Sequence, residues 1–367
     1  MFNARRGFLI LPAIAFLTLT VLADRPQAGP GQIVEAGRML TPRSGHTATL
    51  LQDGRVLIAG GMIHNHEFLD TAELYDSARR KFEPTGRMNI RRVGHVAALL
   101  NDGRVLIAGG WTGGATNEAE LYDSHIGKFT AVSPMNTGRA GATATTLRDG
   151  RVLITGGGKA DDRVGQRSTE LFDPATAKFI SLTDMADART EHTATLLADG
   201  RVLITGGMAD HHVVATAELF DPKTNSFTAV DRLHTARYKH TAQLLGDGRV
   251  LIAGGADDRD WKGTLADAEL YDPATRSFVP AASMSEKRFK LAHESALLPD
   301  GNVLIAGGNA KAEIYNVKQR AFTLLPNGTG TSQWFMTETA LKNGEVLLLG
   351  GYSTSMAATD QTWIYRP

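Results

Sequence analysis

The 367-residue sequence contains no cysteine. No disulfide can therefore stabilise the fold, and no lipid can be attached through a cysteine thiol. The chain also has no charge surplus, because 39 Lys and Arg residues balance 39 Asp and Glu residues. A neutral chain lacks the positive field that nucleic-acid-binding proteins and proteins of anionic membrane surfaces use, so neither partner is expected. No amphipathic helical pattern appears.

Several catalytic motifs are missing as well. The sequence has no Gly-x-Ser-x-Gly elbow, no Walker loop and no His-Glu-x-x-His pair. Acidic residues are plentiful, but the sequence does not single out two that could act together as a glycosidase pair. Serine hydrolases, P-loop NTPases and zinc proteases of these motif classes are therefore not indicated.

What the sequence does contain is a repeat. Asp-Gly-Arg-Val-Leu-Ile-Ala-Gly-Gly at 53–61 recurs in seven copies, the last of which begins at Asn343. The first glycine of each closing pair falls at 60, 109, 156, 206, 254, 307 and 350, so the period is close to 50 residues. A period of this length indicates a repeat array built from one supersecondary unit.

Each unit predicts four short strands. Asp-Gly between two β-prone runs is typical of a hairpin with a type I′ turn, and the Gly-Gly pair ends the second strand. A third strand follows a variable loop, as at 72–76, and a fourth carries an aromatic residue such as Phe82. A four-stranded meander cannot bury both faces alone. We therefore expect an all-β, seven-bladed propeller of four-stranded antiparallel blades.

The same residues carry a resemblance to a family. The Gly-Gly doublet, the Glu-x-Tyr-Asp strand and the Arg-x-x-His lead-in resemble Kelch repeats, and Asp-Gly-Arg-Val-Leu is most similar to Kelch propellers of exported bacterial and galactose-oxidase-like proteins. The resemblance covers about residues 32 to 367 and implies the propeller fold. It implies little about function, because propellers host many unrelated activities. Galactose-oxidase copper chemistry needs a Tyr–Cys cross-link, which a chain without cysteine cannot form.

The N-terminus predicts export. Arg5 and Arg6 precede an uncharged, mostly apolar run at 7–23, and Val21-Leu22-Ala23 is suitable for cleavage. Residues 1–23 are therefore expected to be a signal peptide cleaved after Ala23, with an uncleaved anchor as the alternative. Residues 24–31 have the composition of a linker. The protein is expected in the periplasm or outside the cell.

Residues 32–39 predict how the ring closes. They align with the fourth strand at 81–88 but have no first three strands before them, whereas the chain ends after a third strand at 362–366. We therefore expect residues 32–39 to complete the seventh blade and to remove two exposed sheet edges. Residues 32–367 then form one domain.

An Arg and His pair precedes most first strands and is a candidate ring of charge. The histidine position holds His46, His95, Ala142, His192, His240, His293 and Met336, and the arginine position three residues earlier holds Arg43, Arg92, Arg139, Arg189, Arg237, Lys290 and Gln333. One interpretation is a cationic funnel for a carboxylate ligand. The alternative is a structural network with third-strand glutamates such as Glu73 and Glu218. Blade seven lacks Arg, His and Glu together, which favours the network.

The loops after the Gly-Gly pairs are the second candidate site, because variable loops on a rigid scaffold often carry function. The ligand-binding candidates are Trp111, Arg163, Arg167, His211, His212, Arg259, Asp260, Trp261 and Tyr352, together with Arg43, Arg92, Arg189 and Arg237. His64 and His66 could bind a metal by spacing, as could His211 and His212, but blades one and four lie across the ring. No metal site and no cofactor are therefore predicted.

Two functional hypotheses remain. The first is a non-catalytic, monomeric module that binds a protein, peptide or glycan through its loop face. The second is a periplasmic sugar-acid enzyme, similar to Kelch-type sialic acid mutarotases, for which the sequence identifies no catalytic residue.

Overall fold

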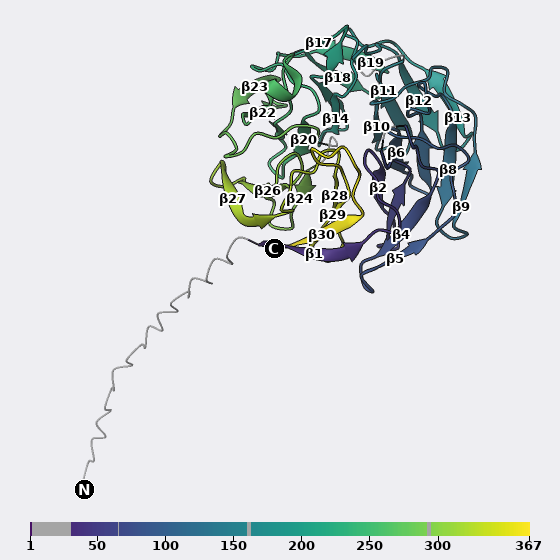
Figure 1. The fold of residues 1–367 in the computed structure, drawn as a ribbon. Helices are drawn as coiled ribbons and strands as arrows, with labels where there is room; N and C mark the ends of the chain where they lie inside the picture. The colour runs from purple at the N-terminus through teal and green to yellow at the C-terminus, as the bar shows by residue number, and fades with distance from the viewer. Residues whose placement is uncertain (2–30, 65, 160–162, 292–294) are drawn as a thin grey trace.

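The computed structural model describes residues 1, 31–64, 66–159, 163–291 and 295–367. Nearly all of the predicted signal peptide and of the predicted linker lie outside these residues. The described chain forms seven four-stranded antiparallel sheets arranged in a ring (Figure 1), and inner-strand residues line a central channel. The predicted seven-bladed, all-β propeller is thereby confirmed. The one helix in the described part is the 3-10 turn η1 (Asp260–Gly263), and no described helix has the length and apolar character needed to span a membrane.

The first four blades follow the chain, each from its innermost to its outermost strand. Blade one comprises β2 (Thr47–Leu50), β3 (Val56–Ala59), β4 (Ala72–Asp76) and β5 (Lys81–Pro84). Blade two comprises β6 (Val96–Leu99), β7 (Val105–Ala108), β8 (Ala119–Asp123) and β9 (Lys128–Ala131). Blade three comprises β10 (Thr143–Thr146), β11 (Val152–Thr155), β12 (Thr169–Asp173) and β13 (Lys178–Ser181). Blade four comprises β14 (Thr193–Leu196), β15 (Val202–Thr205), β18 (Ala217–Asp221) and β19 (Ser226–Ala229), with a loop hairpin of β16 (Met208–Ala209) and β17 (His212–Val213).

The last three blades complete the ring. Blade five comprises β20 (Thr241–Leu244), β21 (Val250–Ala253), β22 (Ala268–Asp272) and β23 (Ser277–Pro280). Blade six comprises β24 (Ala296–Leu297), β25 (Val303–Ile305), β26 (Lys311–Asn316) and β27 (Ala321–Gly328). Blade seven comprises β28 (Thr337–Ala340), β29 (Val346–Leu349), β30 (Gln361–Arg366) and β1 (Gln32–Arg38). Its outermost strand therefore comes from the beginning of the described chain.

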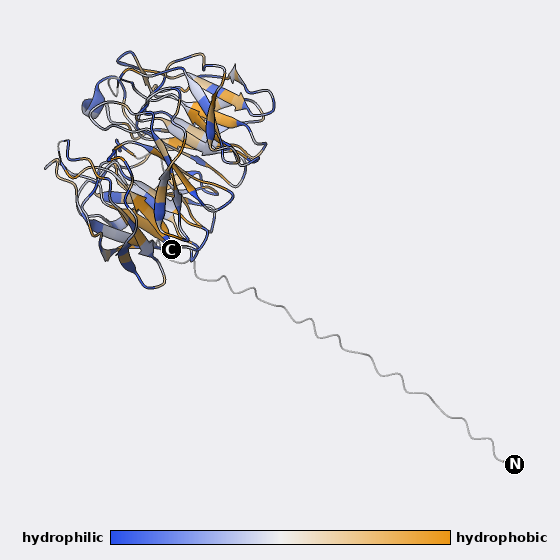
Figure 2. Cartoon of the chain, turned by 90° about the vertical axis from the view of Figure 1, so that its right-hand side faces the viewer, coloured by the Kyte–Doolittle hydropathy of each residue, from blue (hydrophilic) through white to orange (hydrophobic). Residues whose placement is uncertain are grey.

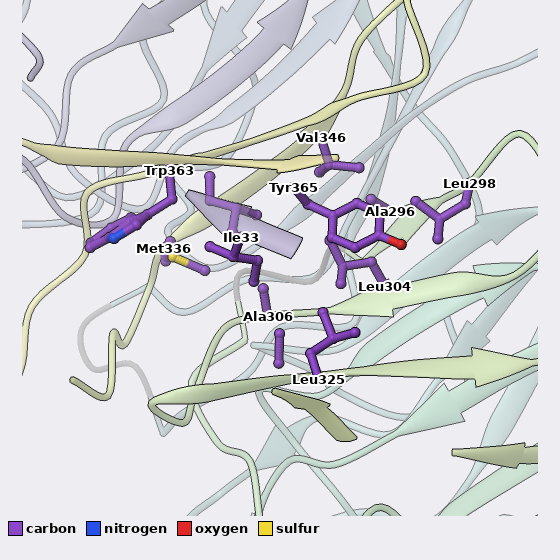
Figure 3. Packing of buried hydrophobic residues seen from close by; sticks show 12 residues of the cluster. Ile33, Ala296, Leu298, Leu304, Ala306, Leu325, Met336, Val346, Trp363 and Tyr365 are labelled. Carbon is purple, nitrogen blue, oxygen red and sulfur yellow. The ribbon is translucent and has the colours of Figure 1, made fainter. Parts of the chain in front are cut away.

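The predicted ring closure is confirmed. β1 pairs antiparallel with β30 from Gln32 opposite Arg366 to Arg38 opposite Gln361. Ile33 is buried in a cluster with Ala306, Met336 and Tyr365, which belong to blades six and seven (Figure 3). The side chain of Asn327 accepts a hydrogen bond from Ile33 N and donates one to Ile33 O. Both ends of the propeller are thus held within one blade.

The core lies between the blades and follows from the repeated Val-Leu-Ile run. All four residues of β3 are buried, and their side chains alternate between the two neighbouring blades. Leu57 packs with Val105 and Ile107 of blade two, while Val56 and Ile58 pack with residues of blade seven. Figure 2 shows the hydrophobic residues concentrated on the strands. Each blade therefore depends on both neighbours for its burial.

The Asp-Gly turns form the predicted hairpins but not the predicted turn type. Gly54 N donates to Leu51 O, and Leu51 N donates to Arg55 O. Gly54 has a positive φ of 91°, whereas the φ of Asp53 is not positive. The hairpin therefore has a type I turn followed by a left-handed glycine, instead of a type I′ turn. The Asp53 carboxylate accepts hydrogen bonds from Arg55, which explains why Arg follows Asp-Gly in five of the seven copies.

Candidate functional site

One residue per blade surrounds the loop-face end of the central channel, just before the first strand. These residues all have left-handed backbone conformations, with φ between 51° and 61°; they are Gly45, Gly94, Gly141, Glu191, Lys239, Lys290 and Phe335. We call them the mouth ring. Five of them line the channel together with inner-strand residues such as Thr47 and Thr193.

Backbone hydrogen bonds connect the mouth ring from blade to blade. Gly94 N donates to Gly45 O at 3.0 Å, and Gly141 N donates to Gly94 O at the same distance. Four of the other five junctions follow the same pattern, and at the blade five–six junction Leu291 N donates to Lys239 O at 3.2 Å. The mouth ring is therefore rigid, and any side chain on it has a defined position.

The mouth ring is chemically asymmetric. Blades one to three have glycine, which adopts positive φ without steric cost. Blades four to seven have Glu191, Lys239, Lys290 and Phe335 at the same conformation, which costs a residue with a Cβ about 1–2 kcal/mol. Strain of this kind is found at functional sites. The side chains of these four residues are therefore the first candidates for function.

A pocket of about 410 Å³ opens over the glycine side of the mouth ring. We call it the mouth pocket; its lining residues are Gly45, Met62, His66, Val93, Gly94, Trp111, Ala140, Gly141, Gly158, Glu191 and Phe335. Trp111 comes from the loop after the second Gly-Gly pair, and Val93 precedes the first strand of the same blade. The volume falls in the range of small-molecule sites. Five residues line both the mouth pocket and the channel, so the two spaces are continuous.

Lysine and aromatic side chains gather at the opposite side of the mouth. The Lys290 ammonium lies 5.2 Å from the ring centre of Trp334 and 5.4 Å from that of Tyr352, and it donates to Tyr352 Oη at 2.9 Å. The Lys239 ammonium lies 5.6 Å from the ring centre of Phe335. Cations over aromatic faces are electrostatically stabilised. Lysine and aromatic side chains of blades five, six and seven thus gather at one side of the mouth.

The loops of blades three, four and five form a connected wall. Arg163 pairs with Asp260 at 3.3 Å, and Tyr238 Oη donates to the same carboxylate. Val213 N donates to Asp258. Asp260 begins the 3-10 turn whose next residue, Trp261, is 68% exposed. His211 N also donates to Arg163 O, so sequence candidates from three different loops are held in one assembly.

The structure places the candidate arginines away from solvent. Arg43, Arg92, Arg189 and Arg237 are at most 1% exposed, and each pairs with a third-strand glutamate. The N–O distances run from 2.7 to 3.1 Å across the six pairs Arg43–Glu73, Arg92–Glu120, Arg139–Glu170, Arg189–Glu218, Arg237–Glu269 and Arg288–Glu313. Each arginine also donates to backbone carbonyls of its own blade, as Arg43 does to Gly60 O. These contacts match the structural network, and the buried guanidinium groups leave no surface for a ligand.

The alignment of blade six needs a correction. Asp247 follows Arg237 by 10 positions, whereas Asp300 follows Arg288 by 12 positions. Blade six therefore has two more residues between its arginine and its turn aspartate than blade five. An alignment that counts back from Asp300 is shifted by these two positions. Arg288, and not Lys290, is the buried arginine of this blade, and Leu291 takes the place of the histidine. His293, which the sequence placed there, lies outside the described residues.

The loop candidates lie in three places. Trp111 lines the mouth pocket, and Tyr352 is 5% exposed beside Lys290. Arg163, Asp260 and Trp261 belong to the wall. Arg167, His211, His212 and Arg259 do not line the mouth pocket: Arg167 donates to Met185 O, and Arg259 pairs with Asp257.

Sequence reasoning missed the mouth ring itself. Glu191, Lys239 and Phe335 stand where blades one to three have glycine directly before the histidine position. That departure from glycine was visible in the sequence. Its meaning depended on the left-handed backbone at this position, which the repeat alone does not reveal.

The channel histidines have a structural role. His46 Nε2 contacts Thr337 Oγ1 of blade seven at 3.0 Å, and His95 Nε2 contacts Thr47 Oγ1 of blade one at 2.9 Å. Burial, and then the charge of Arg43, lowers the pKa of His46 to about 3. A neutral imidazole of this kind does not exchange protons near pH 7. These histidines connect neighbouring blades.

Blade seven carries a buried acid that the sequence analysis did not identify. Glu338 occupies the position of Ala48 and Ala97 in the first two blades and is 5% exposed. Its Oε1 accepts hydrogen bonds from Ala306 N and Gly307 N of blade six, at 2.9 and 2.8 Å. Burial raises its pKa to about 7, while these hydrogen bonds and Arg288 act in the opposite direction.

The Glu338 carboxyl is expected to make stability depend on pH. Because the folded-state pKa exceeds its ordinary 4.5, this carboxyl stabilises the fold most below pH 4.5 and loses that contribution as pH rises through 7. Over this window the loss is about 3 kcal/mol. Glu338→Gln should therefore melt higher than the parent at pH 8 and close to it at pH 5. The measurement is the difference in Tm between the two proteins, which cancels other titrating groups. A difference that stays constant from pH 5 to 8 would contradict this assignment.

The site does not fit a copper centre of the galactose oxidase kind. Within the described residues, no three His, Cys, Asp or Glu side chains are grouped so as to hold a metal ion. His66 and Glu191 are the two residues of these types among the described lining of the mouth pocket. The channel histidines are directed to threonines of neighbouring blades.

Comparison with known proteins identifies a shared fold but no family. No family model matches the chain, and no curated protein matches it in sequence. Among solved structures, the chain is similar to a fungal alcohol oxidase of the AA5 family in complex with copper, with a TM-score of 0.72 and 15% sequence identity. The match covers 92% of this chain and 76% of that one. At this identity the likeness shows a shared fold alone.

Proposed function

We propose that this chain is an exported, monomeric propeller of the Kelch type that binds a protein, peptide or glycan at the mouth pocket without transforming it. The observation that carries the proposal is the asymmetric mouth ring. Three glycines open a pocket on one side, and four non-glycine residues accept a strained backbone on the other. A propeller that needed only stability would have glycine in every blade.

The composition of the mouth pocket suits recognition. Trp111 and Phe335 supply aromatic surface, Met62 and Val93 supply apolar surface, and Glu191 supplies a carboxylate. Sites of this type combine mostly apolar walls with a few polar groups that orient the ligand. The wall formed by the loops of blades three to five adds the exposed Trp261. A rigid exposed aromatic side chain is a common anchor for a macromolecular partner.

The titrating groups support binding over catalysis. The pKa of His46 is lowered to about 3 by burial, which leaves it neutral at any physiological pH. The Glu338 carboxyl has a raised pKa but is buried between blades six and seven. The arginine ring, which could have formed a cationic funnel for a carboxylate ligand, is buried in ion pairs.

The test is a thermal-shift screen of residues 24–367 against peptides, neutral glycans and sugar acids. A ligand at about 100 times its Kd should stabilise the protein by about 2.7 kcal/mol. The shift should disappear in Trp111→Ala and persist in Ile126→Ala, which alters a side chain that is 68% exposed and lies outside the pocket lining. Glu191→Gly should leave unliganded stability within about 1 kcal/mol, because glycine relieves the strain at this φ.

Two results would contradict the proposal. A ligand-induced shift that survives in both Trp111→Ala and Glu191→Gly would place the site elsewhere. Turnover of a sugar acid, followed by NMR, would favour the enzyme.

A further inference from the structure

We infer that the mouth pocket takes an uncharged, apolar side chain of a polypeptide partner, such as leucine, methionine or phenylalanine. This inference rests on the proposed function and specifies which of its ligand classes the pocket fits. A glycan and a cationic side chain are the alternatives that the experiment below distinguishes from it.

The first observation is that the walls of the pocket are apolar. The side chains of Met62, Val93, Trp111, Ala140 and Phe335 line it, and each of these residues is half-buried. They come from blades one, two, three and seven, so the apolar surface surrounds the space from several sides. An apolar group that enters such a pocket removes water from its own surface and from the walls, which is favourable.

The second observation is that the backbone of the pocket is already hydrogen-bonded. Ten of the eleven described lining residues, all except His66, use both the backbone N–H and the backbone C=O in hydrogen bonds within the chain. Val93 and Trp111 exchange two such bonds, at 3.2 and 2.8 Å, and Ala140 and Gly158 exchange two, at 3.0 and 2.7 Å. A hydroxyl-rich ligand would therefore give up hydrogen bonds to water and gain few in return. The pocket disfavours a glycan.

The third observation concerns the charges around the pocket. Glu191, the one carboxylate among the described lining residues, is 9% exposed and already interacts within the chain. The ammonium groups of Lys239 and Lys290 lie 5.6 and 5.9 Å from the ring centre of Phe335. They repel a cation that approaches this wall. The side chain that enters is therefore uncharged, and charge complementarity favours neutral or acidic residues on either side of it.

The fourth observation is an open stretch of backbone next to Trp111. Gly113 and Gly114 follow it in the same loop, and a Cβ on either glycine would meet no atom within 4 Å. Glycine allows another backbone to approach closely. The main chain of a polypeptide therefore has room along this loop while one of its side chains enters the pocket.

The test is a ¹H–¹⁵N NMR titration of residues 24–367, in which Trp111→Phe assigns the indole signal of Trp111 among the four tryptophans. The probes are acetylated and amidated glycine pentapeptides with leucine, phenylalanine, asparagine or lysine at the centre, and a neutral disaccharide. The leucine and phenylalanine peptides should shift the Trp111 signal. The leucine peptide should bind about 10-fold more tightly than the asparagine peptide, which has a similar shape but is polar. Glutamate on either side of leucine should give tighter binding than lysine there.

Variants assign the effect to the pocket, with affinities measured by isothermal titration. Met62→Gln keeps the length of the side chain and adds an amide, so it should weaken binding of the leucine peptide severalfold. Trp111→Ala should weaken it about 10-fold. Ile180→Gln changes a side chain that is 55% exposed and lies outside the pocket lining, so this matched control should bind as the parent does. Val93→Ala replaces Trp111→Ala if that protein does not fold.

The outcomes separate the two proposals. Equal binding of the leucine and asparagine peptides, or Trp111-dependent binding of the disaccharide alone, would overturn the inference and leave the proposed function in place. Preference for the lysine peptide would do the same. Binding that survives in both Met62→Gln and Trp111→Ala would place the site elsewhere. If none of these probes binds, the inference is wrong, and absence of any Trp111-dependent ligand in the wider screen would then remove the proposed function.

Discussion

A chain that begins at Leu40 is expected to lose most of its cooperative stability. The truncation removes β1, which forms the outer edge of blade seven through six residue pairs with β30. It also removes Ile33 and Met39, each 3% exposed, from two different hydrophobic clusters. Loss of two buried side chains of this size costs about 2–5 kcal/mol each. A decrease in Tm of about 10 °C or more should follow.

The matched control is a chain that begins at Gln32, which keeps the whole of β1. Within that chain, Ile33→Ala should reproduce part of the loss, whereas Glu35→Ala, on an exposed position of the same strand, should not. Thermal unfolding followed by circular dichroism gives the comparison. The experimental scatter in Tm is about 1–2 °C. If the Tm of the Leu40 chain lies within that range of the control, β1 does not contribute to the closure of the ring.

Glu218→Gln is expected to destabilise the protein by about 3–5 kcal/mol. Glu218 is 2% exposed, and its Oε1 accepts from Arg189 Nη2 at 3.0 Å while its Oε2 accepts from Ala186 N at 2.8 Å. The substitution leaves the buried guanidinium without its counter-charge. It also places an amide donor beside groups that donate. Burial already lowers the pKa of Arg189, and the Glu218 charge is the chief opposing influence.

Asp187→Asn is the matched control for this prediction. Asp187 lies 3.7 Å from the same arginine, but its side chain is 44% exposed. Solvent screens such a pair, so its loss should cost less than about 1 kcal/mol. Chemical denaturation of the three proteins measures the difference. Equal midpoints for Glu218→Gln and the parent would contradict the assignment of the Arg–Glu pairs as the structural network.

Part of the candidate site could be predicted from the sequence. Trp111 follows a Gly-Gly pair in a variable loop, and that position was sufficient to propose it as a ligand contact. The arginines were ambiguous, because a cation repeated in every blade fits both a funnel and a network. The joint loss of Arg, His and Glu in blade seven favoured the network, and Gln333, Met336 and Trp363 are buried there together. Blade six was misaligned because counting back from Asp300 assumed a constant spacing.

The sequence by itself determined the number of blades, the strand order within each blade and the closure by residues 32–39. Repetition, short apolar runs and turn chemistry are local properties, and seven copies of one local pattern allow few packings. Only the tertiary structure decided which loops meet, that Glu338 is buried against blade six, and that the mouth-ring residues share a left-handed backbone. These features arise from contacts between blades about 50 residues apart, and from backbone angles that neighbouring blades impose. No local pattern contains that information.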